Sequence, residues 1–173
     1  MNATMETILH RRSIRSFLEK PIPKPVLEEI VLAGQYAPSA MNRQNWHFTV
    51  LQNQEKIQSL AKAIAAELGM GEEYCFYRPA ALILVSAPKD SHNGLADCAC
   101  ALENIFLAAW SLDVGSVWIN QLKEICDRPA IRAKLDELGV PAGHLVGGMA
   151  ALGYFETAPE AKPRAEGTVT WVE

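Results

Sequence analysis

Residues 11–17 (RRSIRSF) place three arginines and two serines in seven positions of a chain whose formal net charge is −4. Guanidinium and hydroxyl groups are the donors that bind phosphate in proteins. In an extended conformation, Arg11, Ser13 and Arg15 lie on one side of the backbone, and Arg12 and Ile14 on the other. This pattern predicts an anion-binding segment near the N-terminus.

The spacing also limits the shape of the ligand. At ~3.3 Å per residue, Arg11 and Arg15 lie roughly 13 Å apart, which is too far for one phosphate. The segment therefore suits a long ligand with an anion at one end and an electron-rich polar ring at the other. The alternative is a solvated basic patch that pairs with surface carboxylates, with these candidates: Glu19, Glu28 and Glu29.

Two further polar clusters are candidates for the same ligand. The segment APSAMNRQNWHF (residues 37–48) contains hydroxyl and amide side chains between a helix end and a strand start. Such groups suit the donor and acceptor edge of a heterocycle, but they are also typical of a helix cap followed by an Asx turn. Lys162 and Arg164 in the tail are able to close over an anion, or they belong to an exposed terminus.

Length, charge and hydropathy exclude several classes of protein. The 173 residues are expected to form a single domain, 1–173. A pI of about 5.6 argues against general attraction to nucleic acid or an anionic membrane. No apolar run approaches the roughly 20 residues of a membrane span, and the N-terminus lacks the order of a signal peptide. We therefore expect a cytoplasmic protein with no nucleic-acid or membrane partner.

The cysteines and histidines predict neither a disulfide nor a metal site. Cys98 and Cys100 lie two residues apart in an expected helix and so point to different faces. Cys75 and Cys126 stand alone, and the four histidines form no pair with zinc-site spacing. We expect the cysteines to be buried free thiols in a reducing compartment.

The pattern predicts irregularly alternating helices and strands, typical of an α+β or α/β sandwich. The helix at 94–115 is apolar almost all round, which indicates burial in a core or between subunits. Trp46 and Trp118, beside expected strands, are predicted to be core residues, with stacking on the ring of a bound ligand as the alternative. The expected helices are 4–10 with Thr4 as cap, 25–37 beginning at Pro25 and ending before Pro38, 54–69 stopped by Gly69, 94–115, and 128–139 opened by Pro129. The expected strands are 46–52, 81–88, 115–119 and 144–155.

Four segments, in this order, resemble the nitroreductase family of flavoenzymes: RRSIRSF, APSAMNRQNW, LENIFLAAWSLDVGSVWI and ALGYFETAPEAKPR. The resemblance extends from about Thr4 to Glu166. It implies an α+β fold, an α-β-α sandwich with a central, mostly antiparallel sheet flanked by helices. It also implies an intertwined homodimer in which the C-terminal extension is exchanged with the partner, and two flavins at the interface.

The resemblance assigns the three clusters to flavin mononucleotide (FMN). Within the basic segment, which includes Arg12, it implies that Arg11 and Ser13 hold the phosphate and ribityl end and that Arg15 approaches the N1–C2=O edge of the ring. Lys162 and Arg164 match the family's C-terminal phosphate clamp. The loop that reaches the flavin from the partner subunit corresponds to Pro38, Ser39, Ala40 and Asn42.

The implied function is an oxidoreductase that transfers hydride from NADH or NADPH to flavin N5 and passes electrons to a small aromatic or quinone-like acceptor, including nitroaromatics, by a ping-pong mechanism. No catalytic side chain is assigned, because the flavin carries the chemistry. A fixed guanidinium at Arg15 would stabilise negative charge near N1. The chain departs from many members at Asn45, where they have proline, and in its short lid segment, residues 69–79.

Two other functions stay open from the sequence. One is a specialised enzyme of the same fold, either flavin-cleaving or a dehydrogenase of a peptide-derived or halogenated ring. The other is a non-catalytic module that binds a phosphorylated ligand through the basic residues. The roles of Asp97 and Glu103 on the long helix, as caps, interface groups or partners of the arginines, also stay open.

Overall fold

The apolar run ALILVSAP forms strand β2 (Ala81–Pro88), the centre of the sheet in a computed structural model that describes residues 1–173. Antiparallel pairing joins β2 to β1 (His47–Leu51) on one side and to β4 (His144–Gly153) on the other. β4 in turn pairs with β3 (Gly115–Ile119), so the order is β1-β2-β4-β3. A strand with neighbours on both sides and helices on both faces is apolar throughout, as this one is.

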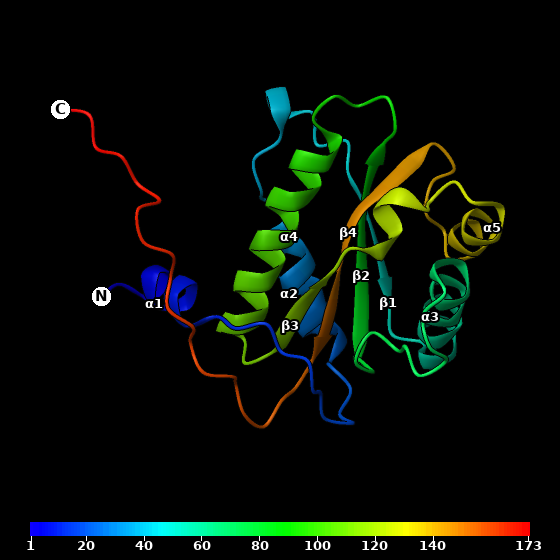
Figure 1. Ribbon diagram of the computed structural model, residues 1–173, viewed down its shortest axis with the longest axis horizontal. Coiled ribbons are helices and arrows are strands. Elements are labelled where there is room, and N and C mark those ends of the chain that lie inside the picture. Colours follow the sequence, from blue (N-terminus) through cyan, green and yellow to red (C-terminus); the bar gives the residue numbers. More distant parts are fainter.

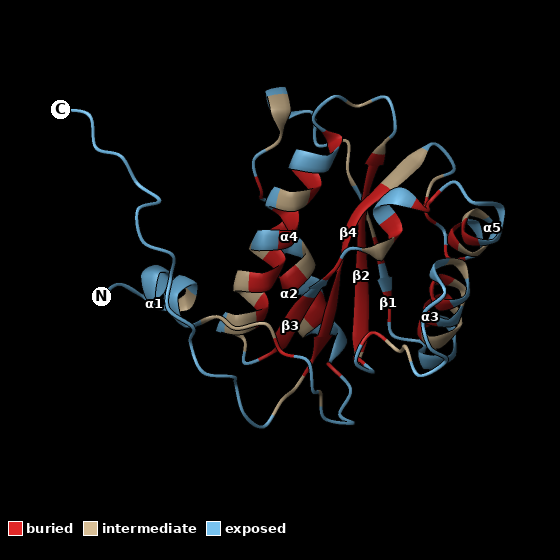
Figure 2. Ribbon diagram, viewed as in Figure 1, coloured by how far each residue is buried: buried red, intermediate tan, exposed pale blue.

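Alternation along β2 divides the core into two layers. Ile83 and Val85 pack with α2 (Lys24–Gln35) and α4 (Gly94–Ser111). Leu82 and Leu84 pack on the other face with α3 (Gln54–Leu68) and α5 (Pro129–Glu137). Figure 1 shows the helices on both sides of the sheet, and Figure 2 shows buried residues along the strands between them. The α+β sandwich predicted from the sequence is confirmed.

Most predicted element boundaries agree with the structure to within a few residues. Gly69 ends α3 in the left-handed conformation, with φ 63° and ψ 31°, and Pro129 is the first residue of α5. The prediction of Thr4 as the cap of α1 (Ala3–His10) is wrong. Asn2 is the cap, because its side-chain oxygen accepts a hydrogen bond from the Met5 N–H at 2.9 Å.

Several elements end earlier than predicted, among them α2 at Gln35 and α5 at Glu137. β1 ends at Leu51, where its pairing with Leu82 ends, and β4 ends at Gly153, the partner of Gly115. α4 ends at Ser111, so the last part of the 94–115 prediction is wrong. Two short 3₁₀ turns were not predicted, η1 (Ala40–Asn42) and η2 (Gln121–Glu124).

The two edges of the sheet differ. The outer edge of β3 is partly covered, because Ser13 bridges Ser116 in parallel and the Ile14 N–H donates to the Ser116 carbonyl at 2.9 Å. The outer edge of β1 has no partner. The C-terminal tail after residue 155 is exposed and extends away from the sheet past α1 (Figures 1 and 2). None of the helices is both long and apolar enough to span a membrane.

Candidate functional site

The basic segment is held at the edge of β3 by Ile14, and its last residue, Phe17, packs against Gly153 of β4. Ile14 is 2% exposed, and it packs so closely on Gly115 that a Cβ there would lie 2.8 Å from the Ile14 side chain. Ser13, bridged to Ser116, and exposed Arg15 flank this anchor. Burial of Ile14 therefore fixes the backbone from which the polar side chains on either side project.

The three arginines have different partners. The Arg11 guanidinium lies 4.0 Å from the Glu103 carboxylate and 5.9 Å from the centre of the Phe106 ring. Arg12 donates to the carbonyls of Leu9 and Arg11, both at 2.8 Å, and so covers the end of α1. Arg15 forms no ion pair. Arg12 therefore differs from the other predicted cofactor ligands, because one of its guanidinium nitrogens, Nη1, is already engaged by the backbone.

A cleft of about 380 Å³ lies beside Arg15. Hydroxyl groups, one guanidinium and backbone groups line it, and no carboxylate does. This donor set fits an anion such as phosphate, because cationic and hydroxyl donors face it without a competing acid. The lining residues come from the basic segment and from the start of the tail, and they are Ser13, Ile14, Arg15, Ser16, Thr157, Ala158 and Pro159.

The predicted clamp residues Lys162 and Arg164 follow this cleft in sequence. Both are exposed and neither forms an ion pair. They lie on the extended tail, so within one chain the structure does not bring them onto Arg15. Their positive charge is available to an anion or to another subunit.

The loop carrying Pro38, Ser39, Ala40 and Asn42 rests on the first turn of α4. The Ala40 N–H donates to the Asp97 carboxylate at 3.0 Å, and the Asp97 residue is only 6% exposed. Ser39 Oγ accepts from the Gln44 N–H at 3.1 Å, while Asn42 has a positive φ of 54°. Asp97 therefore positions this loop. This role could not be predicted from the position of Asp97 in the first turn of α4.

Within one chain, the loop and the basic segment lie at different ends of α4 (Figure 1). Asp97 supports the loop, and Phe106, nine residues further along the helix, contacts Arg11. Nine residues correspond to a rise of about 14 Å. The two predicted halves of the site are therefore not brought together in a single subunit, as an intersubunit site requires.

An aromatic surface adjoins Arg11. The Trp118 ring lies 6.0 Å from the Phe106 ring, centre to centre, and Trp118 is 43% exposed. The prediction that Trp118 is a core residue is therefore wrong, because Phe106 and the β4 backbone at Gly148 cover only part of its ring and the rest faces solvent. Trp46 is partly buried and packs edge-on against Phe48 at 6.0 Å.

The cysteines are free but are not all buried. Burial raises the pKa of the Cys98 thiol to about 12, and it also raises the pKa of Cys126. Such thiols stay protonated and unreactive. Cys75 is partly buried and Cys100 is exposed, so the prediction of four buried thiols is wrong for these two. As predicted, Cys98 and Cys100 point to different sides of α4.

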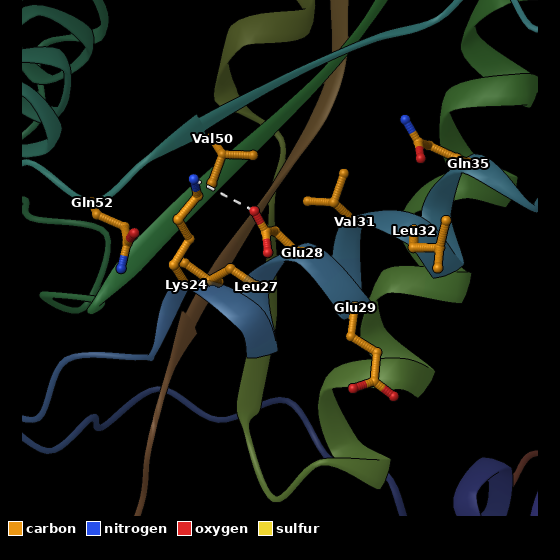
Figure 3. A pocket seen from close by; sticks show the side chains of 9 residues that line it. All are labelled: Lys24, Leu27, Glu28, Glu29, Val31, Leu32, Gln35, Val50 and Gln52. Carbon is orange, nitrogen blue, oxygen red and sulfur yellow. Dashed lines mark ion pairs between the residues drawn. The ribbon is translucent and has the colours of Figure 1, made fainter.

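A second concave surface lies between α2 and the free edge of β1 (Figure 3). Leu27, Val31, Leu32 and Val50 supply an apolar floor, and the Lys24–Glu28 ion pair lies at one end with its atoms 3.5 Å apart. Its volume is about 740 Å³. None of the residues predicted to bind a cofactor lines this groove.

Comparison with known proteins identifies the family. The model of the nitroreductase family matches residues 8–154. A relative from Archaeoglobus fulgidus, provisionally named NADH dehydrogenase/NAD(P)H nitroreductase, is 32% identical over 158 residues, which span 89% of this chain and 86% of the relative. The crystal structure of a Bacteroides fragilis nitroreductase with bound FMN is 43% identical, with a TM-score of 0.94 and 100% of both chains covered.

A nitroreductase from Desulfitobacterium hafniense, also solved with bound FMN, is 27% identical over 100% of both chains, with a TM-score of 0.88. These likenesses extend over the sheet, both helical layers and the basic segment. They agree with the order of the four segments seen in the sequence. The chain therefore has the nitroreductase fold and belongs to the nitroreductase family of oxidoreductases.

Proposed function

We propose that residues 1–173 act as one nitroreductase-like domain that binds FMN, accepts hydride from NADH or NADPH, and passes electrons to nitroaromatic, quinone or related acceptors by a ping-pong mechanism. The observation that carries this proposal is the unpaired Arg15 beside the hydroxyls of Ser13 and Ser16 in a cleft without carboxylates. The similar structures with bound FMN and the name of the Archaeoglobus relative support it.

The chain's own residues divide the work of binding. Arg11 and Ser13 hold the phosphate and ribityl end, with Ile14 fixing the backbone between Ser13 and Arg15. Lys162 and Arg164 on the tail add positive charge to the phosphate clamp. A charge-assisted contact to phosphate is stronger than a neutral hydrogen bond, so these cations set both affinity and the orientation of the ring.

FMN, when bound, supplies reversible hydride transfer at N5 of its ring. Arg15 provides a fixed positive charge at the N1–C2=O edge, where negative charge develops on reduction. A preorganised guanidinium needs no rearrangement at that moment, so it favours the reduced state. Solvent supplies protons, since no carboxylate lines the cleft.

We also propose a homodimer with two intersubunit sites. The loop of Pro38, Ser39, Ala40 and Asn42 lies too far along α4 to meet Arg11 of its own chain, as the 14 Å rise given above indicates. A two-fold arrangement brings the loop of one subunit to the basic segment of the other, because each copy presents both halves. Asp97 then acts as a positioning residue for the partner's site.

The C-terminal tail is proposed to cross to the partner. Val169 and Trp171 are 65% and 86% exposed, and the alternating segment TVTWV has the composition of a strand. The free edge of β1 offers unpaired backbone groups to a further strand. The groove beside it, with Leu32 50% and Val50 40% exposed (Figure 3), offers apolar surface for Trp171.

We further place the protein in the cytoplasm. All four cysteines are free thiols, which fits a reducing compartment. Immunoblotting of separated cytoplasmic and membrane fractions tests this placement, with the cytoplasmic fraction expected to hold the protein.

Replacing Arg15 tests the central proposal. We expect Arg15→Ala to weaken FMN binding about tenfold or more, since a hydrogen bond to a charged group contributes about 1.5–3 kcal/mol. It should also slow reduction of the bound flavin by NADH or NADPH. The measurements are titration of the apoprotein with FMN, and anaerobic stopped-flow loss of flavin absorbance.

Lys62→Ala is the control, because it removes the same charge from exposed α3 on the opposite face of the sheet. It should leave both quantities unchanged. An Arg15→Ala protein with wild-type affinity and wild-type reduction rate would show that Arg15 has no part in the flavin site.

A further inference from the structure

Trp118 is the one exposed residue of strand β3. Its neighbours Ser116, Val117 and Ile119 are 0%, 3% and 3% exposed, whereas Trp118 is 43% exposed. An indole exposed to this degree on a short, otherwise buried strand leaves apolar surface in contact with water. Ser116 and Trp118 lie on the same face of β3, two residues apart, so the exposed ring stands next to the residue that bridges Ser13.

The Trp118 ring packs closely against Gly148 of strand β4. A Cβ at Gly148 would lie 2.6 Å from Trp118 Nε1 and 2.7 Å from Leu102 Cδ1, so the indole occupies space that only glycine leaves free. Phe106 closes one side, with its ring tilted 45° to the indole. Tryptophan held in this way has little rotamer freedom left to lose when a ligand arrives.

Positive charge and the aromatic surface are joined through Phe106. The Arg11 guanidinium lies 5.9 Å from the Phe106 ring centre, and the Trp118 ring lies 6.0 Å from the same centre. A guanidinium beside an aromatic platform matches a ligand that carries both an anion and a flat ring. A basic patch that only faces solvent would not require a tightly packed indole beside it.

We propose that Trp118 is a flavin-contacting residue, whose exposed indole packs against FMN bound along the basic segment. This inference rests on the proposed function. It goes beyond that function by assigning an aromatic contact to a chain position that the family resemblance left without a role. Aromatic contacts contribute through dispersion and offset stacking as well as through burial.

Titration of the apoprotein with FMN tests the contact without relying on turnover. An indole is easily oxidised and quenches an excited flavin only at contact. We therefore expect Trp118→Leu to raise the fluorescence of fully bound FMN several-fold and to raise the Kd for FMN about 3- to 10-fold. Trp118→Phe should restore most of the affinity but not the quenching, because phenylalanine stacks without being readily oxidised.

A pair of glycine variants moves the ring instead of deleting it. Gly148→Ala places a methyl group against Trp118 Nε1, whereas Gly147→Ala, one residue earlier, places it 2.6 Å from the Cys98 Cβ. We expect bound-FMN fluorescence to rise in Gly148→Ala and to stay at the wild-type value in Gly147→Ala. Thermal denaturation of both variants confirms that each is folded at the assay temperature.

Two results would overturn the assignment. One is unchanged fluorescence and Kd for FMN in Trp118→Leu. The other is unchanged FMN fluorescence with dissociation of the oligomer, which would place Trp118 in a subunit interface. Failure of the wild-type apoprotein to bind FMN at all is a different outcome, since it contradicts the proposed function itself.

Discussion

The three arginines near the N-terminus differ in the groups that they contact. Arg12 donates to carbonyls at the end of α1, Arg11 faces Glu103 and Phe106 on α4, and Arg15 is left free. The alternation of an extended segment predicted that Arg12 would point away from Arg11 and Arg15. It could not predict that Glu103 would lie beside Arg11, because that contact depends on how the segment crosses α4.

His144, at the start of β4, gives a prediction at this scale. Burial lowers the pKa of His144, and the nearby charges of His47 and Arg132 lower it further. The unfolded chain, with an ordinary histidine pKa near 6.5, therefore binds more protons than the folded chain below that pH. Stability is fully present above pH 6.5 and is lost as pH falls through the depressed pKa.

We expect His144→Gln to reduce the loss of unfolding free energy between pH 7 and pH 5, measured by urea denaturation at both values. His92→Gln, at an exposed position on a loop, is the control and should retain the wild-type pH dependence. Equal pH dependence in His144→Gln and the wild type would mean that the Ser86–His144 hydrogen bond, 3.1 Å long, compensates for burial.

At the scale of elements, local sequence determined most helices and strands but not the site loop. Gly69 stops α3 and Pro129 opens α5 through backbone properties that are visible in the sequence. The η1 turn is different. Its Ala40 N–H donates a hydrogen bond to Asp97, 57 residues away, and no local pattern near Ala40 indicates that partner. The sequence therefore predicted that this loop carries function, but it did not identify Asp97 as the residue that positions the loop.

The C-terminal end of α3 tests whether the left-handed conformation of a helix cap favours glycine. Gly69 has φ 63°, and a Cβ added there would meet no atom within 4 Å, so Gly69→Ala introduces only backbone strain. We expect it to lower the free energy of unfolding by about 1 kcal/mol, and Gly69→Asn to lower it less. Gly143→Ala also meets no atoms within 4 Å, and it has no positive φ, so it should be neutral or slightly stabilising.

Chemical denaturation of the three variants distinguishes the two effects. An equal loss in Gly69→Ala and Gly143→Ala would show that the left-handed conformation of Gly69 is not the cause of the loss.

At the scale of the whole molecule, a single chain leaves several large apolar side chains exposed to solvent. The apolar face of α1 has Met5, Ile8 and Leu9 between 42% and 46% exposed, and the tail adds Trp171. Exposed apolar surface on this scale is typical of an interaction site. The family resemblance implied an exchanged tail. It could not show which surface receives the tail, because the β1 edge and the α2 groove, the surface that we propose, are brought together only by folding.

The tail gives the last prediction. Because Trp171 is 86% exposed in its own chain, Trp171→Ala should cost the isolated subunit almost nothing. If Trp171 enters the partner's groove, the substitution should instead weaken the dimer by about tenfold or more, since a buried aromatic side chain contributes about 1.5–3 kcal/mol. Sedimentation equilibrium measures this, and the melting temperature should become more dependent on protein concentration.

A matched pair of leucines locates the effect. Leu32→Ser removes apolar surface from the groove, where Leu32 is 50% exposed, and Leu68→Ser removes it from the end of α3, where Leu68 is 41% exposed. Only the groove variant should weaken the dimer. Combined with Trp171→Ala, it should add little further loss, because residues in contact are not independent. Additive losses from Trp171→Ala and Leu32→Ser would place the tail on a different surface of the partner.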